Sequence, residues 1–205
     1  MTTFESTHDF IELNRTFRAL SEQSAQDDDT DISQAHRVGS GLDWPDLIKE
    51  YRVVILSEAG SGKTTEIRNT AQKLDELGKR VFFLRIENIA NDFDDAFEVG
   101  TRESFEEWLE SGDEGWIFLD SVDEARLRNP ADFERAIRKM SRLTKVSKDR
   151  THIVITSRTT SWRPKTDLEL CSAQFPYAAA TESSHNDESS VANYSSKRTR
   201  VPRAT

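Results

Sequence analysis

Short apolar runs alternate with amphipathic stretches through the middle of the chain. Four of these runs are rich in β-branched and aromatic residues, as is typical of strands buried on both faces. They cover residues 52–56, 80–86, 116–119 and 152–156. Between the runs, apolar residues recur at helical spacing and predict helices over residues 63–77, 104–110 and 130–146. Strands that alternate with helices favour parallel pairing through right-handed crossovers, so the sequence predicts an α/β fold, a three-layer sandwich with a parallel sheet.

Individual residues indicate where some of these helices begin and end. Gly78 is placed to end the helix over residues 63–77. Ser104 and Glu107 have the spacing of a capping box, so we expect the second helix to begin at Ser104. Pro45 stands at a first helical position and predicts a short helix over residues 44–48, just before the first strand.

The segments that flank this core have a different character. Apolar residues near a helical repeat predict a short amphipathic helix over residues 9–20, and the acidic stretch 21–31 is typical of a solvated linker. After about residue 170 the chain is rich in Ser, Ala, Thr and Asn without periodicity, so we expect disorder there. The expected organisation is an N-terminal helix and acidic linker, an α/β core and a low-complexity tail, over residues 1–43, 44–170 and 171–205.

Composition narrows the class of protein. A chain of 205 residues can form one sizeable domain with its own core. Its net charge of -9 argues against direct nucleic-acid binding, which needs surplus Lys and Arg. The single cysteine, Cys171, cannot form an internal disulfide. No run approaches the roughly 20 apolar residues of a membrane helix, so we expect a soluble, cytoplasmic protein without a membrane partner.

The strongest chemical signal lies between the first predicted strand and the helix that follows it. Residues 57–64 read SEAGSGKT, a glycine-rich stretch that ends in lysine and threonine. Glycine lets the backbone curl so that successive N–H groups point inward at phosphate oxygens, and the next helix adds its positive N-terminal end. Lys63 would then reach the β and γ phosphates, and the Thr64 hydroxyl would ligate Mg²⁺. The residues expected to hold a nucleoside triphosphate are Ala59, Gly60, Ser61, Gly62, Lys63, Thr64 and Thr65.

One position departs from the usual form of this loop. Ser57 stands where the first glycine is normally found. If that position needs a positive φ angle, serine costs about 1 kcal/mol, which a well-packed loop can absorb. An ordinary glycine turn would also explain the stretch, but the strand before it and the helix after it favour the phosphate-binding interpretation.

Three acidic residues follow the third predicted strand. Asp120 comes directly after the apolar run 116–119, and near the loop strand its carboxylate would reach Mg²⁺ and the water molecules around it. Asp123 and Glu124 are close enough in sequence for one of them to polarise the water that attacks the γ-phosphate. The sequence does not choose between these two acids. Helix capping or solvation would also account for them.

A further candidate catalytic residue lies at the carboxyl end of the fourth predicted strand. Arg158 ends the run Thr156-Ser157-Arg158, where ligand-contacting residues gather in sheets of this kind, and its guanidinium could stabilise charge on the γ-phosphate. With Asp123 and Glu124 it completes our set of candidate catalytic residues. Arg52 and Arg126 are weaker candidates for the same role, and we expect the four tryptophans to serve packing.

Three motifs therefore stand in order along the chain. They are EAGSGKTTE at residues 58–66, FLDSVDEA at 118–125 and IVITSR at 153–158. Together, over residues 42–163, they resemble the NACHT-type branch of the STAND class of P-loop NTPases, the signal-transducing ATPases with numerous domains. The segment 44–51 also resembles the short helix that leads into the loop strand in prokaryotic members.

The resemblance extends to single residues. In this branch an apolar strand is followed by Asp, a small residue, any residue and then Asp-Glu. Asp120, Ser121, Asp123 and Glu124 match that spacing, with Ser121 where glycine is commoner. Arg158 matches the arginine that such proteins carry after the fourth strand.

The resemblance implies a fold and a function. It implies the strand order 5-1-4-3-2, for whose fifth strand the sequence offers no clear candidate, together with binding of ATP and Mg²⁺ and slow hydrolysis. Such proteins switch between an ADP-held resting form and an ATP-bound oligomer, and prokaryotic relatives often serve in antiviral defence. They continue into helical and winged-helix domains and a long sensor. We therefore expect a fragment, a truncated product or a minimal relative. Its expected partners are further copies of the chain in a homo-oligomer, or the missing sensor and effector domains on another chain.

Three functions are compatible with these motifs. The first is a nucleotide switch that hydrolyses ATP, or GTP, between which the sequence does not choose. The second is a non-hydrolysing module in which nucleotide stabilises a shortened core for association with a partner. The third is a small-molecule kinase, which would need an acceptor pocket and an arginine-rich lid that the residues after Arg158 do not suggest.

Overall fold

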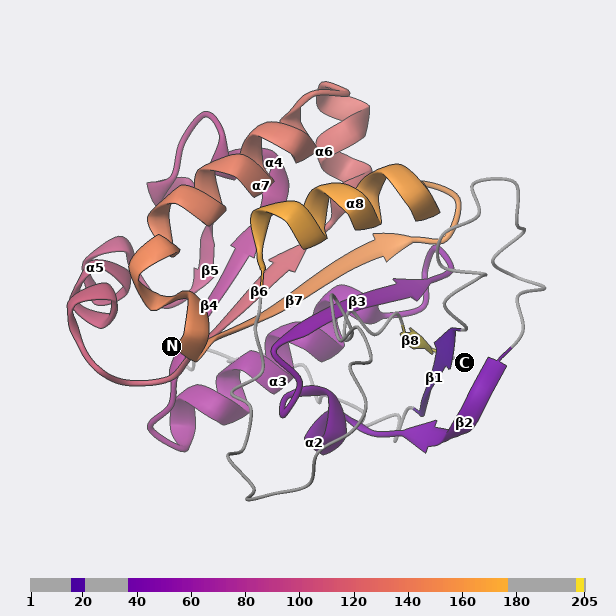
Figure 1. Cartoon of the computed structure of the whole chain (residues 1–205), viewed down its shortest axis with the longest axis horizontal. Helices are drawn as coiled ribbons and strands as arrows, with labels where there is room; N and C mark the ends of the chain where they lie inside the picture. The colour runs from indigo at the N-terminus through magenta and orange to yellow at the C-terminus, as the bar shows by residue number, and fades with distance from the viewer. Residues whose placement is uncertain (1–15, 21–36, 177–201, 205) are drawn as a thin grey trace, which may run out of the picture.

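A mixed sheet forms the middle layer of the structure, a computed structural model that describes residues 16–20, 37–176 and 202–204. Its strands, in chain order, are β1 (Phe17–Leu20), β2 (Arg37–Leu42), β3 (Arg52–Ser57), β4 (Arg80–Arg85), β5 (Phe97–Val99), β6 (Gly115–Asp120), β7 (Thr151–Arg158) and β8 (Pro202–Ala204). Across the sheet these strands lie in the order β2-β1-β8-β3-β7-β6-β4-β5 (Figure 1). The fold is therefore α/β with a mostly parallel sheet.

The four long central strands are parallel and in continuous register. Arg52 lies beside Ile153 and Ser57 beside Arg158 where β3 pairs with β7, and Gly115 lies beside Thr151 where β6 pairs with β7. β4 pairs with β6 in the same sense, β5 is antiparallel to β4, and β1 is antiparallel to both β2 and β8. β8 runs parallel to β3 on the side away from β7.

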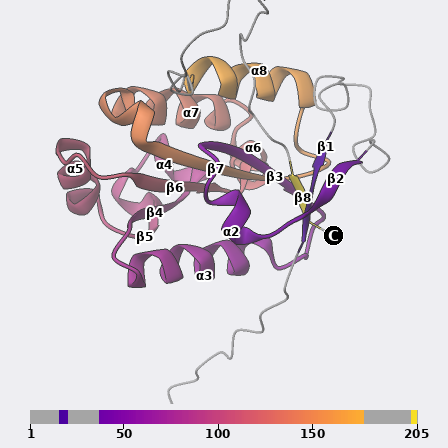
Figure 2. The same ribbon diagram turned by 60° about the horizontal axis from the view of Figure 1, so that its bottom comes forward.

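Helices cover both faces of the sheet, so the molecule has three layers. The helices are α2 (Trp44–Leu47), α3 (Lys63–Glu76), α4 (Ile86–Ile89), α5 (Arg102–Glu110), α6 (Val122–Arg128), α7 (Asp132–Leu143) and α8 (Pro164–Gln174), with 3-10 turns η1 (Asp94–Ala96) and η2 (Lys145–Arg150). Figure 2 shows α3 on one face of the sheet and α7 and α8 on the other. None of the helices within these ranges is long and apolar enough to span a membrane.

The core is divided by the sheet into two hydrophobic clusters. Side chains alternate across a strand, so Val53 of β3 lies in the cluster on the α3 side while its neighbour Val54 lies in the cluster on the side of α7 and α8. On the α3 side the strands meet Ile67, Ala71 and Leu74 of that helix. On the other side they meet aromatic and aliphatic residues of several helices, among them Phe105, Trp108, Phe133, Ile137 and Met140. The four predicted strands are confirmed, and their burial on both faces explains why they are apolar runs.

Several helical predictions are also confirmed. α2 begins with Pro45 in its first turn, and α3 ends just before Gly78, whose φ of 74° is left-handed. α5 begins at Arg102, two residues earlier than predicted, because the capping box is formed by Thr101 and Ser104 rather than by Ser104 and Glu107. α7 ends at Leu143, and η2 replaces the last residues of the expected helix.

Two predictions about the flanks differ from the structure. Residues 17–20 form strand β1 rather than the end of a helix, because pairing with β2 and β8 satisfies their backbone, and Phe17 packs edge-on against Trp44. Residues 9–15 of that predicted helix and the linker 21–31 lie outside the described residues. The boundary expected at residue 170 falls inside α8, and residues 202–204 of the expected disordered tail form β8.

One glycine of the sheet is fixed by its neighbour. A Cβ atom added to Gly115 would lie 2.3 Å from Cε2 of Trp108, whose ring is fully buried and donates from Nε1 to the Asp113 carbonyl. We predict that Gly115→Ala lowers the free energy of unfolding by about 1–3 kcal/mol, because the indole has to move. In the control Gly112→Ala, the new Cβ would meet nothing within 4 Å. Urea denaturation measures both, and equal stability of the two variants would contradict the packing described.

Candidate functional site

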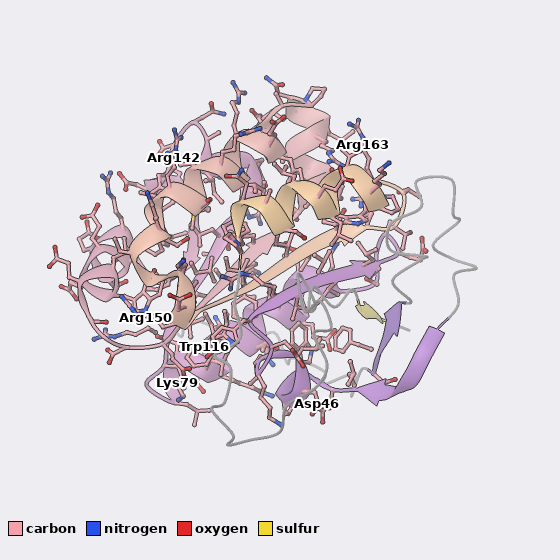
Figure 3. The ribbon with its side chains drawn as sticks, in the orientation of Figure 1. Asp46, Lys79, Trp116, Arg142, Arg150 and Arg163 are labelled. Atoms are coloured by element: carbon pink, nitrogen blue, oxygen red, sulfur yellow. The ribbon has the colours of Figure 1, made fainter. Side chains whose placement is uncertain are left out.

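Three neighbouring parallel strands end in polar residues at one edge of the sheet. Ser57, Asp120 and Arg158 are the last residues of β3, β6 and β7. In Figure 3, Trp116 lies near the amino end of β6, and Arg163, just before α8, lies toward the opposite end of the sheet. The candidate site is at this opposite, carboxyl end, where ligands bind in open α/β sheets.

The glycine-rich loop joins β3 to α3 at this edge. Gly60 and Gly62 have φ angles of 70° and 77°, and Gly62 directly precedes the first residue of α3. A Cβ on Gly60 would meet nothing within 4 Å, so the backbone angle rather than crowding requires glycine there. The exposed residues of the loop, Ala59 and Gly60 among them, leave its outer surface open to solvent.

Ser57 fits the loop without the strain considered above. It lies within β3, is fully buried, and is not among the described residues with positive φ. Its Oγ accepts a hydrogen bond from the Ser61 hydroxyl at 3.2 Å, which links the start of the loop to its far side. The cost of about 1 kcal/mol expected for serine in a left-handed conformation therefore does not arise.

The first two residues of α3 bring the loop into contact with β6. Thr64 donates a hydrogen bond from Oγ1 to Oδ2 of Asp120 at 2.7 Å, joining residues 56 positions apart in the sequence. The Lys63 amine is half-buried, and burial lowers its pKa, while the charges of Asp120, Asp123 and Glu124 oppose that shift. The predicted acids thus gather around the predicted lysine.

Asp120 is held on both of its carboxylate oxygens. Its residue is 1% exposed, so water cannot solvate the charge, and hydroxyl groups do so instead. Oδ2 accepts from Thr64 and, at 2.9 Å, from the Ser121 hydroxyl, and Oδ1 accepts from the Thr156 hydroxyl. The sequence predicted Thr64 and Asp120 as ligands of Mg²⁺, but it did not predict that Thr156 and Ser121 donate hydrogen bonds to Asp120.

Asp123 and Arg158 form an ion pair. Arg158 Nε lies 2.5 Å from Asp123 Oδ2, and the side chains are 40% and 5% exposed respectively. The second oxygen of Asp123, Oδ1, has no hydrogen-bond partner within the described ranges. Glu124, the next residue, is exposed. The two acids that the sequence could not separate therefore have different surroundings.

The two weaker arginine candidates serve the fold instead. Arg52 is buried and donates to backbone carbonyls of Phe175, Tyr51, Thr151 and Lys148. Arg126 contacts the Ser161 carbonyl and the buried carboxylate of Asp167, which fastens α6 to α8. The packing role expected of the tryptophans holds for Trp108, Trp116 and Trp162, which are buried.

The donor set at this edge consists of oxygen atoms. Hydroxyl and carboxylate oxygens suit Mg²⁺, which usually takes one or two protein ligands and completes its shell with phosphates and water. Within the described ranges, no cluster of three or more His, Cys, Asp or Glu side chains is arranged to hold a metal ion by itself.

Comparison with known proteins does not assign the chain. No model of a known protein family matches the sequence, and no curated protein shows significant similarity to it.

The left-handed conformation of Ser121 gives a direct stability test. Its φ of 69° is the only positive value among the non-glycine residues that the structure describes. Ser121→Gly and Ser121→Ala both remove the hydroxyl, but only alanine keeps a Cβ in this conformation. We predict that the alanine variant is less stable than the glycine variant by about 1 kcal/mol. Thermal or urea unfolding measures the difference, and an alanine variant at least as stable as the glycine variant would exclude the left-handed backbone.

Proposed function

We propose that the chain binds a nucleoside triphosphate with Mg²⁺ at the loop 58–65 and hydrolyses it slowly, as a NACHT-type nucleotide switch. The observation that carries the proposal is the 2.7 Å hydrogen bond between Thr64, at the start of α3, and Asp120, at the end of β6. A loop threonine beside a strand-end carboxylate is the arrangement needed to hold Mg²⁺ against two phosphates.

The order of the strands supports the proposal. Numbered by their position in the chain, the parallel strands β3, β7, β6 and β4 lie as first, fourth, third and second. This is the 1-4-3-2 part of the order that the resemblance implies. β8 lies parallel to β3 on its other side and comes from a segment in which the sequence offered no strand. In our proposal it takes the position of the fifth strand.

The loop supplies the groups that a polyphosphate requires. Left-handed glycines at positions 60 and 62 curl the backbone, and the positive end of the 14-residue helix α3 faces the same region. Lys63 is the first residue of that helix, and partial burial strengthens its attraction to a negatively charged ligand. In our proposal these groups bind the β and γ phosphates.

The metal would be held by Thr64 and Asp120. Mg²⁺, when bound, would neutralise charge between the β and γ phosphates. The hydroxyl of Thr64 and the carboxylate of Asp120 supply hard oxygen donors, and the buried position of Asp120 keeps its carboxylate fixed. The proposal covers both ATP and GTP, since the loop, Lys63, Thr64 and Asp120 would bind the phosphates and Mg²⁺ and not the base.

We assign different roles to the two neighbouring acids. A general base has to reach the attacking water. Glu124 is exposed, whereas Asp123 is buried and engaged with Arg158. In our proposal Glu124 polarises the water and Asp123 orients the Arg158 guanidinium. Because the Arg158 side chain is 40% exposed, part of it remains available to a γ-phosphate.

The signalling part of the proposal depends on the motifs. Residues 58–66, 118–125 and 153–158 carry the NACHT resemblance, and with it a nucleotide-dependent switch, self-association and a role in antiviral defence.

Removal of the loop lysine tests the proposal. We predict that Lys63→Ala weakens ATP binding at least tenfold and abolishes phosphate release, because the charge that binds the β and γ phosphates is lost. Lys73→Ala is the control, since it removes the same charge from an exposed position near the other end of α3. Titration calorimetry and a malachite-green assay measure the two effects. Binding without turnover in the wild-type chain would favour the non-hydrolysing module, and equal binding by Lys63→Ala and wild type would exclude the site.

The assignment of the two acids makes a separate prediction. Glu124→Gln should lower turnover by about 10²–10⁴-fold with nucleotide affinity nearly unchanged, because only the base is lost. Asp123→Asn should retain more turnover than Glu124→Gln, since it weakens the ion pair with Arg158 but leaves the general base, Glu124, in place. Single-turnover phosphate release compares them. Full activity of Glu124→Gln together with an inactive Asp123→Asn would reverse the assignment.

A further inference from the structure

A buried threonine connects β6, which carries the proposed metal ligand Asp120, to β7, which carries Arg158, the proposed contact to the γ-phosphate. Thr156 lies on β7 two residues before Arg158 and is fully buried. Its hydroxyl donates to Oδ1 of Asp120 and accepts a hydrogen bond from the backbone N–H of Ser121 at 3.3 Å. One side chain of β7 thus contacts both the last residue of β6 and the residue that precedes α6.

We propose that Thr156 is a positioning residue that fixes the rotation of the Asp120 carboxylate. The inference rests on the proposed function, in which Asp120 and Thr64 hold Mg²⁺. With Oδ1 bound to Thr156, the other oxygen, Oδ2, is the one presented to Thr64 and the loop. Without that bond the carboxylate is held through Oδ2 alone, and it can turn over a wider range about its terminal torsion, which has no strong rotamer preference.

The other hydrogen bonds to Asp120 do not replace this one. Thr64 donates to Oδ2, the oxygen on the loop side, and leaves Oδ1 without a donor from α3. Ser121 also donates to Oδ2. Among the described residues, Thr156 alone donates to Oδ1, and it does so from β7, which pairs with β3 on one side and β6 on the other.

The same hydroxyl also fixes the start of α6. By accepting from the Ser121 N–H group, Thr156 satisfies a buried donor at a residue with left-handed φ. Asp123 and Glu124 are in the first turn of α6, directly after this residue. Thr156 therefore orients the carboxylate of the metal site and the backbone that carries the two acids.

The experiment compares Thr156→Val with Thr156→Ser in the full chain. Valine keeps the shape but has no hydroxyl, whereas serine keeps both hydrogen bonds. Binding of a fluorescent ATP analogue is measured as a function of Mg²⁺ concentration and again in EDTA. We expect the valine variant to need about 10–100-fold more Mg²⁺ for half-maximal effect, with affinity in EDTA unchanged, and the serine variant to stay within about twofold of wild type.

The alternative outcomes are distinct. A valine variant with the wild-type Mg²⁺ dependence, or valine and serine variants shifted equally, would overturn the positioning role. If valine prevents folding, Thr156→Ala gives the same comparison without a methyl group against the carboxylate. If neither variant folds while Thr156→Ser does, the role is structural and the inference is overturned. A wild-type chain that binds no nucleotide would instead overturn the proposed function, and this inference with it.

Discussion

The hydrogen bond between the Thr64 hydroxyl and the Asp120 carboxylate is the contact on which the site depends. It joins the helix that follows the glycine-rich loop to the end of β6, two strands away from β3 in the sheet. The parallel arrangement of the strands makes this contact possible, because parallel strands end at one edge and their terminal residues meet there. The left-handed glycines of the loop then turn the chain so that α3 begins at the same place.

The surroundings of Asp120 show how a buried charge is kept in a fixed orientation. The carboxylate is shielded from solvent, and hydroxyl groups from α3, from β7 and from the adjacent Ser121 donate to it. Each donor lies on a different segment, so the carboxylate connects the loop helix, the sheet and the start of α6. The nearby Arg158–Asp123 ion pair extends this polar cluster to the end of β7. In the proposed function, this one cluster would hold the metal ion through Asp120 and contact the γ-phosphate through Arg158.

Sequence patterns predicted the central strands and the loop because their signals are local. Apolar β-branched runs indicate buried strands, and the glycines before Lys63 and Thr64 require a tight bend. β1 could not be predicted, because its apolar spacing also fits a helix and its partners β2 and β8 are distant in sequence. α8 was not predicted, because its buried residues, Pro164, Asp167 and Cys171, do not form an apolar stripe at helical spacing. The role of Thr156 depends on a cross-strand contact that spacing does not show.

The proposed metal and phosphate site is tested most directly by a crystal structure of the chain with Mg²⁺ and a non-hydrolysable ATP analogue. We expect the β and γ phosphates inside the loop 58–65, and Mg²⁺ next to Thr64 with Asp120 on its other side. A nucleotide bound elsewhere, or a metal ion that lies away from both residues, would contradict the proposed site.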